Sequence, residues 1–257
     1  MTDPTRSNQD RRAPWRDYHA YSWRLRVGLI VPPNNTIAEI EFAALAPEGV
    51  SAHATRMDLH IDMSHGFDAL YADLEQPLKH LAAASVDIVA YACTASSIQV
   101  PLADLTGRMT AISGIPAIST AQASVDALRA LGARRLAVAT PYVAAINEHE
   151  RHFLEAQGFE VLAIEGLGIG ETLDDFRYLA RVPPEAVYRL ARRVDRPDAD
   201  AILISCMDLA TLPVLQRLET DCNKPVVTSN LATFWSSLRR GGIADRIDGV
   251  ARLLTEH

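Results

Sequence analysis

Apolar and polar positions follow one another along this chain in blocks that predict strands separated by helices. Short apolar runs at 26–31, 50–57, 87–92 and 116–119 predict β-strands. Leucines at helical spacing over 70–84, together with the segments 37–45 and 121–131, predict helices between them. Alternation of this kind is typical of parallel α/β architecture, so the sequence predicts an α/β fold.

The same order of blocks begins again at residue 135. Pro32 and Pro141 both follow a predicted strand, Pro116 and Pro225 both begin one, and each pair is separated by 109 positions. Because loop lengths change more easily than strand order, we interpret this as an internal duplication. We expect two pseudo-symmetric, flavodoxin-like parallel-sheet lobes, residues 25–133 and 134–257, with a C-terminal segment that crosses over between them. Residues 1–24 form an aromatic-rich arm that we expect to pack on the body or on a neighbouring subunit.

Two cysteines occupy matched strand ends in the two halves. Cys93 follows DIVAYA and Cys206 follows DAILIS, each run beginning with an aspartate. The loops after the carboxyl ends of parallel strands build binding crevices, so we expect both thiols to face one cleft between the lobes. The loop residues expected to line this cleft with them are Pro32, Asn35, Thr94, Ala95, Tyr142, Met207 and Asp208. Thiols on opposite faces of one carbon suit a cofactor-free isomerase or racemase, because one can add or accept a proton while the other protonates.

Simpler interpretations exist for these residues. Free cysteines are often small buried hydrophobes, and Asn35 has the chemistry of a helix cap. Asp208 suits either a solvated loop charge or a group that tunes the Cys206 thiol. Cys222 lies in a polar turn without a counterpart in the first half, so we expect a structural role for it.

Composition narrows the partners. The 257 residues are 48% hydrophobic and 22% charged, which is typical of a globular protein. A net charge of −7 without a basic run argues against a nucleic-acid partner. No run approaches the roughly 18 apolar residues of a membrane span. Three widely spaced cysteines indicate free thiols in a reducing cytoplasm. We expect a small-molecule substrate, no cofactor, and a homo-oligomer, either a dimer or a tetramer.

Two further patterns have some features of ligand sites. Asp58, His60, Asp62 and His65 alternate as on one strand face, but without a third clear ligand we expect no metal there. Glycines at 166, 168 and 170 lack GxGxxG spacing, so we expect a flexible loop near the cleft rather than a nucleotide site.

A set of short motifs recurs in order through residues 26 to about 243. They are Gly28-Leu29-Ile30-Val31-Pro32 with Asn35-Thr36, Tyr91-Ala92-Cys93-Thr94 with Ser97, Pro141-Tyr142, Arg181 with Pro183-Pro184-Glu185, Ser205-Cys206, and Lys224-Pro225-Val226-Val227 with Ser229-Asn230, Ala232, Trp235 and Leu238-Arg239. This order resembles the aspartate/glutamate racemase superfamily and, within it, the maleate cis-trans isomerase and arylmalonate decarboxylase group.

The resemblance implies that Cys93 adds to an alkene, that Cys206 is its acid/base partner, and that Asn35 and Tyr142 bind carboxylate oxygens. The decarboxylases resemble this pattern with glycine at the first cysteine, so Cys93 favours an isomerase most like maleate isomerase. A two-cysteine racemase of the aspartate/glutamate/hydantoin type and an arylmalonate-type decarboxylase are the alternatives.

The chain departs from the group's pattern around the cleft, which leaves the substrate open. Pro33 and Asn34 stand where the group has two serines, and Met207, Asp208 and Ala210 interrupt its Thr-Asn-x-Arg. An asparagine that the group has shortly before Arg181 is absent.

Overall fold

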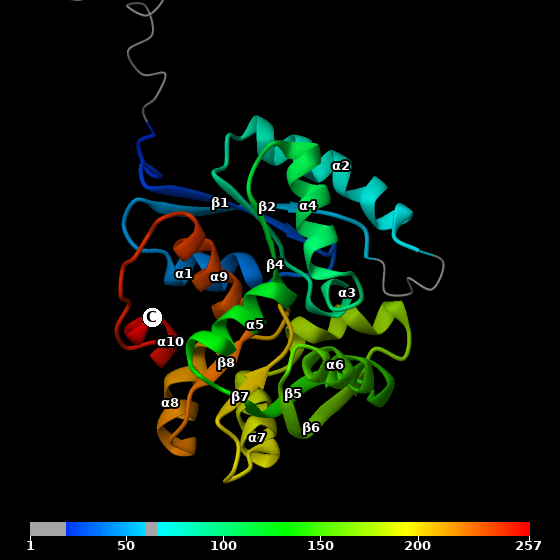
Figure 1. The fold of residues 1–257 in the computed structure, drawn as a ribbon, viewed down its shortest axis with the longest axis vertical. Coiled ribbons are helices and arrows are strands. Elements are labelled where there is room, and N and C mark those ends of the chain that lie inside the picture. The colour runs from blue at the N-terminus through cyan, green and yellow to red at the C-terminus, as the bar shows by residue number, and fades with distance from the viewer. Residues whose placement is uncertain (1–18, 60–65) are drawn as a thin grey trace, which may run out of the picture.

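Two four-stranded parallel sheets form the framework of the computed structural model, which describes residues 19–59 and 66–257 (Figure 1). The first sheet has the order β2-β1-β3-β4 and the second the order β6-β5-β7-β8. The strands of the first half are β1 (Leu25–Val31), β2 (Val50–Arg56), β3 (Ile88–Tyr91) and β4 (Ala117–Ser119). Those of the second half are β5 (Arg135–Tyr142), β6 (Glu160–Ile169), β7 (Ala201–Ile204) and β8 (Val226–Thr228). The matching orders confirm the predicted α/β architecture of two related sheets.

Helices separate the strands in both halves. In the first half they are α1 (Ala38–Leu45), α2 (Asp68–Ala83), α3 (Thr94–Ser97), α4 (Leu102–Ser113) and α5 (Thr120–Ala130). In the second half they are α6 (Ala144–Ala156), the 3-10 helix η2 (Leu173–Arg181), α7 (Pro184–Val194), α8 (Leu212–Cys222), α9 (Ser229–Arg240) and α10 (Arg252–Glu256). The expected elements of the first half agree with the structure within about two residues, but α3 and α4 were not anticipated.

Helices α5 and α9 join the two halves. They pack against each other between the sheets, and each contacts both β4 and β8 (Figure 1). Phe42 of α1 meets Phe234 of α9 edge to face, with ring centroids 5.4 Å apart. One hydrophobic core consequently extends from Leu29 in the first sheet to Val138 in the second, and a smaller core lies between the first sheet and helices α2 and α4.

The glycine-rich segment at 166–170 and the aromatic arm were each the subject of a prediction. The glycine-rich segment is not a flexible loop, because Gly166 and Gly168 lie within β6, whose pairing with β5 continues to Ile169. Of the aromatic arm, Tyr21 is 87% exposed and Trp23 57% exposed, so neither packs fully on the body. Residues 1–18 of the arm lie outside the described part of the chain.

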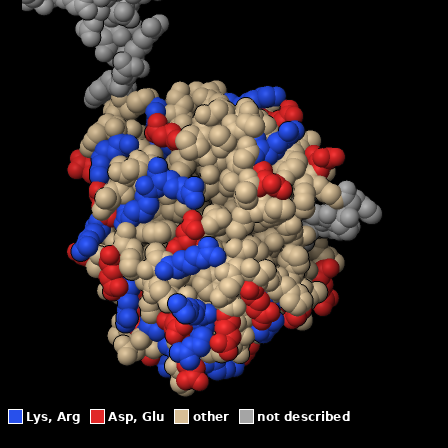
Figure 2. Space-filling model, in the orientation of Figure 1, with Lys and Arg blue, Asp and Glu red and all other residues tan. Residues whose placement is uncertain are grey.

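Charged side chains of both signs are intermixed on the surface. Figure 2 shows them most densely on the left and at the lower end of this face, with smaller groups at the upper right and a broad uncharged area between. Many form ion pairs such as Arg193 with Glu165 at 2.6 Å. Exposed pairs of this kind contribute little to stability, so the fold depends mainly on its cores.

Candidate active site

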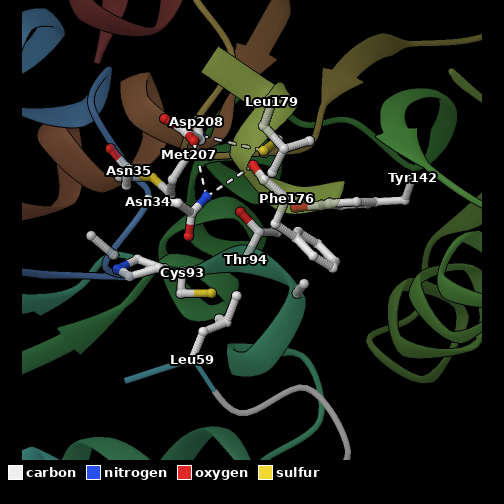
Figure 3. A pocket seen from close by; sticks show the side chains of 14 residues that line it. Asn34, Asn35, Leu59, Cys93, Thr94, Tyr142, Phe176, Leu179, Met207 and Asp208 are labelled. Carbon is white, nitrogen blue, oxygen red and sulfur yellow. Dashed lines mark hydrogen bonds between the residues drawn. The ribbon is translucent and has the colours of Figure 1, made fainter. Parts of the chain in front are cut away.

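A pocket lies where the carboxyl ends of β1, β3, β5 and β7 converge between the two sheets. Its described lining residues are Pro32, Asn34, Asn35, Leu59, Ala92, Cys93, Thr94, Ala95, Tyr142, Phe176, Leu179, Cys206, Met207 and Asp208 (Figure 3). All nine residues expected at the cleft are among them. The prediction of their location rested on strand ends alone, because parallel strands deliver their following loops to one edge of a sheet.

Cys93 occupies the position between β3 and α3. Its backbone is extended, with φ −141° and ψ 115°, and the short helix α3 begins at the next residue. The side chain is buried, which raises the pKa of the thiol. The Ser96 hydroxyl and the backbone N–H groups of Ser96 and Ala95 donate toward the sulfur and oppose this rise. The site therefore holds a neutral thiol at rest, with donors already arranged for a thiolate.

Cys206 follows β7 in the equivalent position. The backbone N–H of Asp208 donates to its Sγ at 3.3 Å, and the neighbouring Tyr142 hydroxyl favours the thiolate form of the sulfur. Burial, and next the nearby Asp208 carboxylate, raise the pKa of the Cys206 thiol far above its ordinary value. Cys206 is accordingly a proton donor in the resting site.

Asp208 is buried, not a solvated loop charge. Only 3% of the residue is exposed, and burial raises the pKa of its carboxyl to about 6. Its Oδ1 accepts the backbone N–H of Thr36 at 2.9 Å, and its Oδ2 accepts Nδ2 of Asn34 at 3.2 Å. The carboxylate thus ties the loop after β1 to the loop after β7, next to the Cys206 sulfur.

Asn35 accepts hydrogen bonds at the start of a helix, as the prediction of a helix cap proposed. Its Oδ1 accepts the backbone N–H groups of Ile37 and Ala38 at 3.2 and 3.1 Å, at the start of α1. Arg56 fixes the same residue by donating to its carbonyl oxygen at 3.1 Å. Because Oδ1 is occupied in this way, the side chain has only its Nδ2 hydrogens to offer to a ligand.

Tyr142 is held at the carboxyl end of β5 by its neighbours. Its backbone N–H donates to Thr140 Oγ1 at 3.0 Å, and its ring lies 6.2 Å from that of Phe176. A Cβ on Gly166 would lie 2.0 Å from the Tyr142 carbonyl oxygen, so only glycine permits this approach of β6 to β5. Burial raises the pKa of the Tyr142 phenol well above its ordinary value, which keeps it a donor.

Five lining residues were not among those expected. They are Asn34, Leu59, Ala92, Phe176 and Leu179. Phe176 and Leu179 come from η2, a segment whose amphipathic spacing was available in the sequence but whose position over the pocket was not. Asn34 stood out only as a departure from the group's serines.

The metal site considered in the sequence involved Asp58, His60, Asp62 and His65. His60, Asp62 and His65 lie outside the described residues. Within 19–59 and 66–257, no three His, Cys, Asp or Glu side chains come together in a way that could hold an ion. Over the same ranges, no helix has the length and apolar character needed to cross a membrane.

Comparison with known proteins gives consistent similarities over most of the chain. The arylmalonate decarboxylase family model matches residues 27–254. A maleate isomerase from Nocardia farcinica is 31% identical over 244 residues, 90% of this chain and 96% of that protein. An arylmalonate decarboxylase from Bordetella bronchiseptica is 31% identical over 236 residues, again with 90% and 96% covered.

Solved structures of maleate isomerases also superpose on this chain. The maleate isomerase Iso from Pseudomonas putida S16, a cysteine-to-alanine variant with maleate, superposes with a TM-score of 0.82 at 28% identity, covering 90% of this chain and 97% of that one. A cysteine-to-serine mutant of the Nocardia farcinica enzyme, with a covalently bound succinylcysteine intermediate, also gives 0.82 at 29% identity, covering 91% and 99%. The fold of the two sheets is therefore that of these enzymes.

Proposed function

The chain belongs to the arylmalonate decarboxylase family, and from that premise we propose that it is a cofactor-independent isomerase that acts on a small carboxylate through Cys93 and Cys206, in the manner of a maleate cis-trans isomerase. The observation that carries the proposal is that both thiols line one pocket from equivalent strand ends. The covalent succinylcysteine in a relative of the same fold supports addition of a cysteine to a double bond.

The reaction begins with addition of sulfur to the alkene. Cys93 loses its proton to solvent, its thiolate forms a C–S bond, and the π electrons move to the neighbouring carbon and its carbonyl group. The Cys206 thiol protonates that carbon, which leaves a single bond free to rotate. Cys206 then removes the proton again, the double bond forms in the trans arrangement, and the Cys93 thiolate leaves.

Donors around the pocket stabilise the charge that develops. The Nδ2 hydrogens of Asn35 and the hydroxyl of Tyr142 bind substrate oxygens, and the backbone N–H groups of Ala95 and Ser96 support the Cys93 thiolate. Since burial raises the pKa of Cys93, we expect the rate of the addition step to increase with pH over the neutral range.

A panel of cis-configured unsaturated acids, maleate included, tests the reaction by the appearance of the trans isomer in proton NMR spectra. We expect Cys93→Ser and Cys206→Ser to lose at least about 100-fold in turnover. Cys222→Ser is the matched control, because Cys222 is half-buried in α8 and does not line the pocket. Full turnover by both pocket variants would overturn the two-thiol mechanism.

The family also contains a decarboxylase at 31% identity, which makes decarboxylation the second candidate. Release of carbon dioxide from a disubstituted malonate that depends on Cys206 and not on Cys93 would select it. Incorporation of deuterium at the α position of a chiral amino acid or hydantoin, dependent on both thiols, would select the racemase.

Two further expectations belong to this proposal. A reducing compartment such as the cytoplasm suits an enzyme whose chemistry needs two free thiols, because oxidation of either would end its role. A dimer or tetramer remains our prediction, and light scattering of the purified protein measures it.

A further inference from the structure

Hydrogen-bond acceptors line one side of the pocket. The Asn34 side chain has two N–H hydrogens, and its Nδ2 donates to the backbone carbonyl of Phe176 at 3.0 Å and to Asp208 Oδ2 at 3.2 Å. Both hydrogens are thereby used within the protein, which leaves Oδ1 as the only group that Asn34 can offer to a ligand. Figure 3 shows this oxygen pointing toward the side of the pocket where Cys93 and Thr94 lie.

Asp208 adds a buried negative charge next to Asn34. Among the described residues that line the pocket, it is the one with a formally charged side chain. The carboxylate accepts from Thr36 and Asn34, and the backbone N–H of Ile37 is a further donor to it, so it retains a lone pair for one more donor. Burial raises the pKa of Asp208 to about 6, so the carboxyl is ionised at pH 8.

Arg56, a basic side chain whose charge acts on Asp208, is already engaged. Arg56 does not line the pocket; it pairs with Glu39 at 3.0 Å and donates to the Asn35 carbonyl at 3.1 Å. A substrate carboxylate placed beside Asn34 and Asp208 would therefore face two acceptors and a like charge. At about 6 Å and an effective dielectric constant of about 20, that repulsion weakens binding by about 100-fold.

We propose that the substrate is a monoanion whose second end is a primary carboxamide, with its N–H groups donating to Asn34 Oδ1 and Asp208. Asn35, the adjacent lining residue, has N–H hydrogens to offer to the amide carbonyl, so the pair Asn34 and Asn35 supplies one acceptor and one donor as an amide requires. The single carboxylate then lies toward Tyr142.

The substrate class that combines this end group with an activated double bond is the monoamide of a cis-butenedioic acid. The amide carbonyl replaces one carboxylate as the group that receives electrons when the Cys93 thiolate adds, so the same bonds form and break as in the isomerisation of a dicarboxylate. The reaction in this inference rests on the proposed function, but the preference for an amide is a property of the pocket and can be measured without turnover.

Binding to the Cys93→Ser variant measures that preference. Succinate and its monoamide succinamate are saturated, non-reacting mimics of the two substrate types, and calorimetry at pH 8 gives their dissociation constants. We expect succinamate to bind at least about tenfold more tightly than succinate. Equal or weaker binding of succinamate, or no binding of either compound, overturns the inference.

Two substitutions locate the preference. Asp208→Asn in the same background should reduce the ratio of the two dissociation constants at least about tenfold, mainly by tightening succinate. Asp174→Asn is the control, because Asp174 lies on the exposed side of η2 with 67% of its side chain exposed, and it should leave the ratio unchanged. If Asp208→Asn does not fold, Asn34→Ser provides the second test, since it removes the acceptor carbonyl and should also lower the ratio.

Turnover separates this inference from the proposed function. Wild-type enzyme at pH 8 should isomerise maleamate with a kcat/KM at least about tenfold above that for maleate. If neither acid is isomerised but succinamate still binds preferentially, the proposed reaction is wrong and the amide pocket stands. If maleate is isomerised at least as well as maleamate and succinamate has no advantage, the reaction stands and the amide pocket is wrong.

Discussion

Glu41 connects the two halves of the molecule, and replacing it with alanine should destabilise the fold. The residue lies on α1 of the first half and is only 5% exposed. Its Oε1 accepts the backbone N–H groups of Thr211 and Leu212 at 2.6 and 2.7 Å, where α8 of the second half begins. Its Oε2 accepts Nδ2 of Asn230 in α9 at 2.8 Å. Thr211 does not cap this helix with its own side chain, so Glu41 supplies the acceptor that the helix start needs.

The magnitude follows from the donors that would lose their partner. In Glu41→Ala, the N–H groups of Thr211 and Leu212 have no replacement acceptor, and each buried unsatisfied donor costs about 1–3 kcal/mol. Asn230 Nδ2 keeps a long hydrogen bond to the Leu209 carbonyl at 3.5 Å, so losing the Glu41 acceptor costs less free energy at Asn230 than at the two backbone N–H groups. Burial of the carboxylate, which raises the pKa of Glu41, offsets part of the total. We therefore expect a loss of about 3 kcal/mol, equivalent to about 6–12 °C in Tm for a domain of this size.

Chemical denaturation followed by circular dichroism measures this loss, with Glu41→Gln as the matched variant. Glutamine keeps one carbonyl oxygen for the two backbone donors and should cost only about 1 kcal/mol. A loss below about 1 kcal/mol for Glu41→Ala, or equal losses for the two variants, would refute the role of the carboxylate as the cap of α8.

Three further predictions concern the site and its support. Burial raises the pKa of Glu150 from 4.5 to about 7, so the folded state loses stability as pH rises through this range. Glu150→Gln should remove about 3 kcal/mol of that loss between pH 5 and pH 8. Free energies of unfolding that change with pH in the same way for the two proteins would contradict this. Gly166→Ala should destabilise by about 2 kcal/mol or more because its Cβ would strike the Tyr142 carbonyl, whereas Gly107→Ala in α4, where space is open, should stabilise slightly in thermal melts. Tyr142→Phe should lower kcat about tenfold or more with little change in Tm, because it removes the pocket hydroxyl proposed to bind a substrate oxygen; an unchanged kcat would exclude that role from the mechanism.

The sequence was sufficient to predict the elements that carry the site. Buried strands such as β3 (Ile88–Tyr91) are recognisable because a parallel strand is covered on both faces and its composition is apolar throughout. The offset of 109 positions then related the two halves, and the strand ends located Cys93 and Cys206 at one edge. These inferences depend on local composition and on a rule that parallel sheets share, so they did not require the tertiary structure.

Only the tertiary structure determined which hydrogen-bond partners each polar side chain has. Asn34 bonds residues 142 and 174 positions away along the chain, and that engagement is what converts its side chain into an acceptor for the pocket. The sequence allows Asp208 to be a solvated charge, whereas in the folded protein the residue is buried against the loop after β1. Glu41 has the sequence context of an ordinary helix surface, yet it caps a helix of the other half. Sequence patterns determined where the strands end and which thiols meet there, because apolar composition is local. Which hydrogens and lone pairs remain for a substrate depends on partners brought together by folding, and the structure alone could assign them.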